Sequence, residues 1–198
     1  MSPANQTLAS LLADVAECDL CAKDLPLGPR PTLAAERGAR VLIIGQAPGT
    51  RVHATGIPWN DPSGERLRGW LGVAPDDFYD ASKFAIIPMG FCYPGRLPRG
   101  GDAPPRGECA PAWHGKLLAA LPEIQLTVLI GMYAQNYYLA ARRRTLTETV
   151  TNWREFGPEV IPTPHPSWRT TGWQKKHPWF EAELVPELQR RVKALIGA

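Results

Sequence analysis

Hydrophobic and polar residues follow two different patterns along the chain, and the difference separates expected strands from expected helices. Short apolar runs bounded by loop residues predict buried strands at residues 39–45, 83–91, 124–131 and, over only two residues, 160–161. Apolar residues spaced by three and four predict amphipathic helices at residues 5–17, 63–73, 108–122, 133–141, 145–153 and 178–196. Asn5 and Ser63 stand where the first two helices would be capped, and Pro186 predicts a kink in the last helix.

Expected strands and helices alternate in chain order, which is typical of an α/β fold. We therefore expect a three-layer sandwich, in which a four-stranded, mostly parallel sheet has helices on both faces. In such sheets ligands bind beyond the carboxyl ends of the strands. The segments that follow the four strands, GQAPG, GFCYPG, GMYAQ and PHPSWR, should therefore meet at one edge. A length of 198 residues fits a single domain spanning 1–198.

Composition narrows the compartment and the partners. A formal net charge of +3 permits a polyanionic partner without requiring one, and basic residues gather at 96–106, 142–144 and 169–176. Because no apolar run approaches the roughly 18 residues of a membrane helix and the N-terminus lacks a leader pattern, we expect a cytoplasmic protein without membrane contact. We further expect it to be a monomer. Cytosolic thiols stay reduced, so the four cysteines are expected to be thiols or metal ligands.

Two motifs follow the first and last expected strands. GQAPG, residues 45–49, has glycines that permit a sharp turn and a close backbone approach to a ligand, although such a turn is often purely structural. It is followed by GIPWNDPSG and, much later, by HPSWR. Together these segments resemble the uracil-DNA glycosylase superfamily, whose members carry a G-[QE]-x-P-[YG] first motif and an H-P-S second motif. The resemblance covers residues 43–169 and is closest to the iron-sulfur branch, family 4, although Gln46 replaces its Glu and Trp59 its Phe.

The resemblance implies cleavage of the N-glycosidic bond of a base that has been flipped out of the DNA stack. Trp59 then matches the residue that stacks on the base. His165 matches the residue that stabilises the departing base anion. Ser167 is expected to contact a backbone phosphate. The following loop supplies Trp168 or Arg169 as a wedge into the stack and places cations near phosphates, namely Lys175 and Lys176.

The chain departs from the family where water would be activated. Ala47 stands where the efficient members have an aspartate. The amide of Gln46 is no base, but it could position water or contact the flipped base. Asp61 is the nearest carboxylate, and it either activates water or caps the following helix beside Ser63.

A second departure concerns recognition of the base. Pro88 occupies the position at which family 4 reads uracil with an asparagine. The base would then be read by Asn60, by Gln46 and Ala47, or by backbone groups near Met89 and Gly90, and it could be a deaminated or oxidised base other than uracil.

Four cysteines complete the resemblance. Cys18 and Cys21 form a C-x-x-C, and the spacing of Cys92 and Cys109 resembles the second cysteine pair of family 4. The resemblance implies a [4Fe-4S] cluster that pins the first helix and the 92–109 loop. Zinc is the alternative, because thiolates suit both. Arg96 lies in the same loop, where it could contact a phosphate.

These features favour a monofunctional DNA base glycosylase of base excision repair, with uracil as the first expected base and DNA containing a damaged base as the partner. A lyase step is not expected, because the motifs contain no lysine. The alternative is a catalytically weak or silent protein that binds damaged or single-stranded DNA, which Ala47 and Pro88 would permit. A small-molecule nucleobase protein is disfavoured by the basic loop after HPS.

Overall fold

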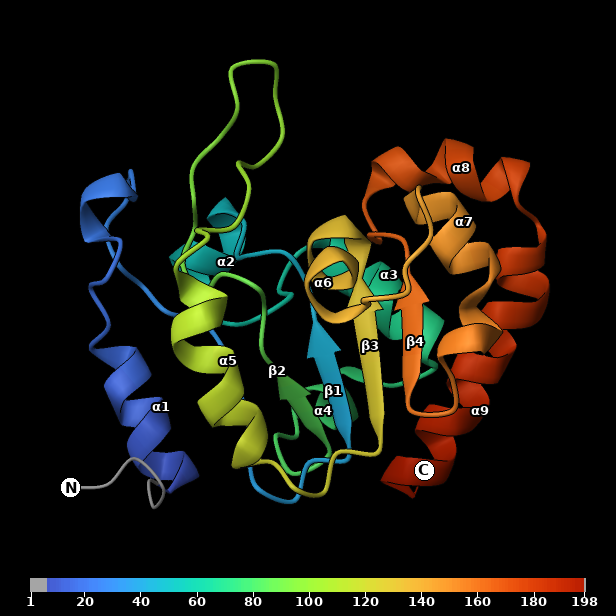
Figure 1. Cartoon of the computed structure of the whole chain (residues 1–198), viewed down its shortest axis with the longest axis horizontal. Coiled ribbons are helices and arrows are strands. Elements are labelled where there is room, and N and C mark those ends of the chain that lie inside the picture. Colours follow the sequence, from blue (N-terminus) through green and yellow to red (C-terminus); the bar gives the residue numbers. More distant parts are fainter. Residues whose placement is uncertain (1–6, 198) are drawn as a thin grey trace.

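The computed structural model describes residues 7–197 and contains one four-stranded sheet (Figure 1). The strands are β1 (Val41–Ile44), β2 (Phe84–Ile86), β3 (Leu126–Ile130) and β4 (Val160–Thr163). They lie in the order β2-β1-β3-β4 and every pairing is parallel. Central β1 is paired on both sides, because Val41 is in register with Phe84 and with Leu126. All four carboxyl ends therefore reach the same edge of the sheet.

Side chains of the central strand alternate between two hydrophobic cores, one on each face of the sheet. Val41 and Ile43 pack into one core, whereas Leu42 and Ile44 pack into the other. All four side chains are buried, which explains why the strand is continuously apolar.

Helices cover both cores, so the α/β three-layer fold predicted from the sequence is confirmed (Figure 1). The first core is covered by α3 (Pro62–Leu71), α4 (Pro75–Phe78), α7 (Leu146–Thr151) and α9 (Val185–Ile196). The second core is covered by α1 (Leu8–Ala16), α5 (Cys109–Ala119) and α6 (Gly131–Tyr138). Two further helices, α2 (Thr50–Thr55) and α8 (Thr171–Lys176), lie in loops beyond the carboxyl edge of the sheet.

The helix caps differ from the predicted ones. Thr7 caps α1, since its hydroxyl accepts a hydrogen bond from the Ser10 N–H at 3.2 Å, whereas Asn5 lies outside the described residues. Asp61, not Ser63, caps α3, because its carboxylate accepts from the Gly64 N–H at 2.8 Å. Pro62, between Asp61 and Ser63, is the first residue of α3. Proline suits this position because it has no N–H group to satisfy.

The kink predicted at Pro186 takes the form of a change in helix type. A π-helical turn at Phe180–Leu184 runs directly into α9, and Pro186 lies in the first turn of α9. Because proline cannot donate the backbone hydrogen bond of a regular helix, the widened turn just before it is the physical counterpart of the predicted interruption.

Candidate active site

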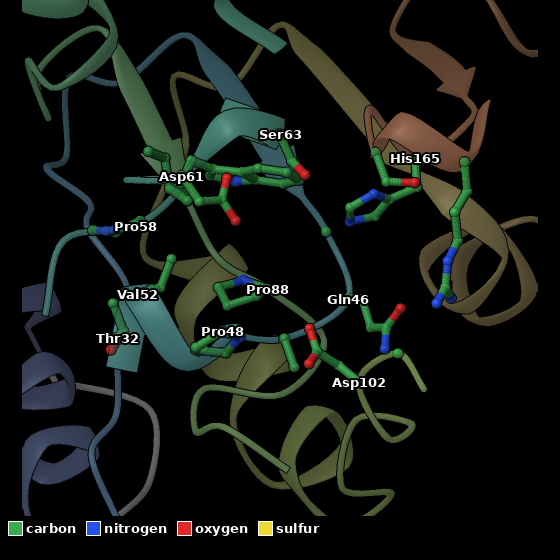
Figure 2. Close-up of a pocket in the computed structure, with 18 of the residues that line it drawn as sticks. Thr32, Gln46, Pro48, Val52, Pro58, Asp61, Ser63, Pro88, Asp102 and His165 are labelled. Carbon is green, nitrogen blue, oxygen red and sulfur yellow. The ribbon is translucent and has the colours of Figure 1, made fainter. Parts of the chain in front are cut away.

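A cavity of about 450 Å³ lies at the carboxyl edge of the sheet, where the strand order predicts a ligand site (Figure 2). Its walls come mainly from four segments that are distant in sequence, and Thr32, which precedes β1, also lines it. The four segments are the loop after β1, the loop leading into α3, the loop after β2 and the loop after β4, represented by Gln46, Trp59, Asp102 and His165.

Trp59 is held in an uncommon backbone conformation by two glycines. Its φ is 56°, in the left-handed region that bulky residues rarely adopt. A Cβ placed on Gly45, at the end of β1, would lie 2.7 Å from the indole ring. A Cβ placed on Gly64, in the first turn of α3, would lie 1.7 Å from the Trp59 carbonyl oxygen. Both positions therefore require glycine, and the fold fixes the indole in the cavity wall at the cost of local strain.

His165 lies next to this indole in the cavity wall. The ring centroids of Trp59 and His165 lie 5.7 Å apart, with the planes inclined by 35°. Desolvation lowers the pKa of His165, and attraction to the Asp61 carboxylate only partly opposes this shift. The imidazole is therefore neutral at pH 7, with one nitrogen carrying a proton. The Thr170 hydroxyl fixes the turn by hydrogen bonding to the His165 carbonyl oxygen at 2.9 Å.

The loop after β4 is anchored from two sides. Arg66 of α3 donates a hydrogen bond to the Ser167 carbonyl oxygen at 2.9 Å. Gln135 of α6 is buried, and its amide donates to the carbonyl oxygens of Thr163 at 2.8 Å and Leu129 at 3.3 Å, which ties the end of β4 to β3. Sequence reasoning missed both anchors, because neither belongs to a motif.

Asp61 and Gln46 both line the cavity, and both also have structural partners. The Asp61 carboxylate caps α3 and in Figure 2 points into the cavity. The two interpretations of this residue from the sequence are thus compatible. The Gln46 side-chain nitrogen donates to the Ala103 carbonyl oxygen at 2.9 Å and so holds the loop after β2 against the loop after β1.

Of the expected base-contacting residues, Ala47 lines the cavity together with Gln46 and Trp59. Met89 and Gly90 have another place: their N–H groups donate to the carbonyl oxygens of Gly45 at 2.9 Å and Gln46 at 3.0 Å. The Met89 side chain packs in the second core, and Gly90 borders a separate cavity next to the cysteines.

Asn60 and Pro88, the two other residues considered for base recognition, differ in their relation to the cavity, because only Pro88 lines it. Asn60 is half-buried in the turn before α3, where its N–H donates to the Ile57 carbonyl oxygen at 3.3 Å. Pro88 lies in the cavity wall itself, so an apolar ring occupies the expected place of the asparagine.

Residues expected to contact DNA surround the mouth of the cavity. Ser167, Trp168 and Arg169 line it, and Trp168 is 77% exposed. The Arg169 guanidinium lies 5.6 Å from the centre of the Trp168 ring. Lys175 and Lys176 are exposed at the end of α8. An exposed indole next to a guanidinium, followed along the chain by two exposed lysines, is suited to contact with a polyanion that carries aromatic bases.

The four cysteines converge on a second, small cavity. Cys18, Cys21, Cys92 and Cys109 all border it, together with Arg106. Burial raises the pKa of Cys21 and Cys92 and raises that of Cys109 to about 12. Two features nevertheless favour thiolates. The positive charge of Arg106 partly offsets the rise in the pKa of Cys21. The Phe91 N–H donates a hydrogen bond to the sulfur of Cys109 at 3.4 Å.

The four thiols are not arranged around a metal ion. Within residues 7–197, no group of three or more Cys, His, Asp or Glu side chains is placed to hold one. Zn–S bonds of about 2.3 Å would require the sulfurs to close in around a zinc ion. Cysteine thiolates are equally the ligand type of iron-sulfur clusters, and all four border one cavity, so the residue types suit either group.

Asp102 and Arg96 also line the active-site cavity, and Asp102 was missed from the sequence. The only available signal was an acidic residue in the otherwise basic stretch 96–106.

Residues 32–189 match the model of a known protein family, described as UDG: Uracil DNA glycosylase superfamily. The match covers most of the chain, including every residue named above as lining the active-site cavity. It includes Cys92 and Cys109, whereas Cys18 and Cys21 precede it. Among the described residues, no helix is long and apolar enough to cross a membrane.

Proposed function

Since the chain belongs to the uracil DNA glycosylase superfamily, we propose that it is a monofunctional DNA base glycosylase of base excision repair, with uracil as the first base to test. The observation that carries this proposal is the pairing of Trp59 and His165 in one cavity. A flipped-out base stacked on the indole would present its edge to the imidazole.

The proposed chemistry begins with departure of the base, which leaves an oxocarbenium-like sugar and an anionic base. The neutral imidazole of His165 donates its N–H to the developing oxyanion of the base. In a desolvated site such a donor typically contributes about 10²–10³-fold in rate. Asp61 contributes a negative charge that faces the cationic sugar. Gln46 fixes the loop that carries Ala47, through its bond to Ala103.

DNA is proposed to bind across the mouth of the cavity. Trp168 or Arg169 enters the stack as the wedge that fills the hole left by the flipped base. Lys175 and Lys176 bind phosphates, and Ser167 contacts the phosphate nearest the flipped nucleotide. This arrangement is supported by the exposure of Trp168, by the position of Ser167, Trp168 and Arg169 in the lining of the cavity, and by the exposure of the two lysines on α8.

We also propose that the chain belongs to the iron-sulfur branch of the superfamily and that Cys18, Cys21, Cys92 and Cys109 hold a [4Fe-4S] cluster. When bound, the cluster would cross-link the end of α1 to the start of α5 and supply no redox step. Visible absorbance and iron analysis of the purified protein would test this. Stoichiometric zinc in a colourless protein would contradict it.

A second candidate function is binding of damaged or single-stranded DNA without efficient hydrolysis. It is favoured by Ala47 and Pro88, which line the cavity at the positions where the efficient members have an aspartate and family 4 has an asparagine, respectively. A single domain spanning 1–198, a monomeric state and a cytoplasmic location stay predictions.

The deciding experiment uses single-stranded and duplex oligonucleotides that carry one uracil, hypoxanthine or xanthine. Alkali-dependent cleavage by the wild type, lost in His165→Ala but retained in His177→Ala, is the expected result. His177 is a matched control, because it stacks on Trp173 at 4.4 Å in α8, away from the cavity. Tight binding without cleavage of any substrate would select the second function.

A further inference from the structure

We propose that Asp102 is the catalytic base that orients and deprotonates the attacking water, replacing in space the aspartate that is missing at position 47. This inference rests on the proposed glycosylase function. After the C1′–N bond has broken, the water oxygen forms a bond to C1′ of the oxocarbenium-like sugar. The base leaves with the bonding electron pair, and the water proton passes to the Asp102 carboxylate.

The position of the carboxylate is the first argument. Asp102, Ala47 and Gly49 border the same cavity. The Asp102 Oδ2 atom lies 3.4 Å from the place that a Cβ on Gly49 would occupy. Figure 2 shows this carboxylate near Gln46 and Pro48, across the cavity from Asp61. A carboxylate from a distant segment therefore lies beside the very loop that carries Ala47.

The second argument is that the segment bearing Asp102 is fixed in place. Residues 95–103 form a hairpin, in which Arg96 pairs with Asp102 in an antiparallel bridge. The Ala103 N–H donates to the Gly95 carbonyl oxygen at 2.9 Å, and the Ala103 carbonyl oxygen accepts from the Gln46 amide at 2.9 Å. The residue next to Asp102 is thus tied to the loop after β1, as pre-organised catalysis requires.

The surrounding charges suit a base. Three charged groups face Asp102: Arg96 from the hairpin, Arg169 from the loop after β4 and Asp61 from the loop before α3. Partial desolvation raises the pKa of Asp102 and Asp61 adds to this shift, while the two arginines oppose it. A carboxylate with a raised pKa accepts a proton more readily than an ordinary one.

Asp61 is less suited to the same task. One of its carboxylate oxygens already accepts the N–H of Gly64 as the cap of α3. Its negative charge also acts on His165, because it opposes the lowering of the His165 pKa. We therefore assign Asp61 to the electrostatics of the His165 side of the cavity and Asp102 to the water.

The test measures single-turnover base release at saturating enzyme across a range of pH, on the base that the wild type excises. Asp102→Asn should lose about 10²-fold in rate, the lower end for general base catalysis, together with the acid limb of the pH profile. Asp102→Glu should recover part of the rate. Asp76→Asn is the matched control. It makes the same charge change at an exposed residue of α4 and should behave as wild type.

Unfolding and DNA-binding measurements on Asp102→Asn should show a stability and an affinity no lower than wild type, because the change removes a partly desolvated negative charge. An unchanged rate and acid limb in Asp102→Asn would overturn the inference alone. Loss of the acid limb in Asp61→Asn instead would also overturn it, by assigning the base to Asp61. A wild type that releases no base would overturn the proposed function, and this inference with it.

Discussion

Replacing Gly64 by alanine tests whether the position of Trp59 is sterically enforced. The added Cβ would lie 1.7 Å from the Trp59 carbonyl oxygen and 2.7 Å from its carbonyl carbon. Real Cβ atoms essentially never approach closer than 3.0 Å, so position 64 and the Trp59 backbone must separate by at least about 1.3 Å, the difference between 3.0 and 1.7 Å. The shift would also move the indole relative to His165, whose ring is 5.7 Å away.

The energetic expectation follows from two opposing effects. Forcing extra volume into a packed site typically costs about 1–3 kcal/mol. Alanine inside a helix gains about 0.5–1 kcal/mol over glycine. Gly69 lies in the same helix, and a Cβ there meets nothing within 4 Å, so Gly69→Ala should show the gain alone. The two variants should therefore differ in unfolding free energy by about 1–3 kcal/mol.

Urea unfolding followed by far-UV circular dichroism measures this difference, and base release measures the displacement of Trp59. A misplacement of about 1 Å in a catalytic site can cost roughly 10²-fold in rate, so Gly64→Ala should be slow while Gly69→Ala keeps wild-type activity. If Gly64→Ala proved as stable and as active as Gly69→Ala, the steric account of the cavity wall would be refuted.

Four further predictions concern single side chains. Trp59→Leu should weaken binding of DNA that carries the damaged base by roughly 10–100-fold in a fluorescence titration, since stacking contributes about 1–3 kcal/mol per base. Burial lowers the pKa of His165 and of His114, which is buried in α5. The unfolded chain therefore binds more protons than the folded one as the pH falls below about 6.5. The unfolding free energy should therefore fall as the pH drops through this range, and less steeply in His165→Gln. Gln135→Leu should cost about 1–3 kcal/mol in urea unfolding and slow base release, because it removes two buried hydrogen bonds at the ends of β3 and β4. Trp168→Ala should leave unfolding within about 0.5 kcal/mol of wild type, because the side chain is 77% exposed, but should weaken DNA binding.

The architecture could be predicted because its signals are local. Each strand is an apolar run long enough to identify, and the alternation with helices leaves few ways to arrange a parallel sheet. Even the two-residue run at 160–161 marked β4, which extends from Val160 to Thr163. Predictions at the level of single residues depended on finer chemistry. Asp61 displaced Ser63 as the cap of α3, because Pro62 is the better first helical residue.

Asp102 could not have been found in this way, because its position depends on a contact across 57 residues. The Gln46 amide bonds to Ala103, and this contact helps to hold the 95–103 hairpin against the loop after β1. The sequence shows that Asp102 lies in the basic stretch 96–106, but it does not show which cavity this stretch borders. A motif search that stops at Ala47 therefore finds a missing carboxylate, whereas the folded chain has one beside that loop.

The same reasoning applies to two glycines, the first residue of GQAPG and the last residue of GIPWNDPSG. Gly45 and Gly64 are 19 positions apart and are separately plausible as a turn and a helix residue. In the structure both glycines are required by one residue, Trp59. Its indole lies against Gly45, and its backbone carbonyl lies against Gly64. The two glycines together therefore allow Trp59 to adopt its φ of 56° and to pack next to His165. A variant with a flexible loop at Trp59 would lose the stacking plane even with every polar residue of the cavity intact.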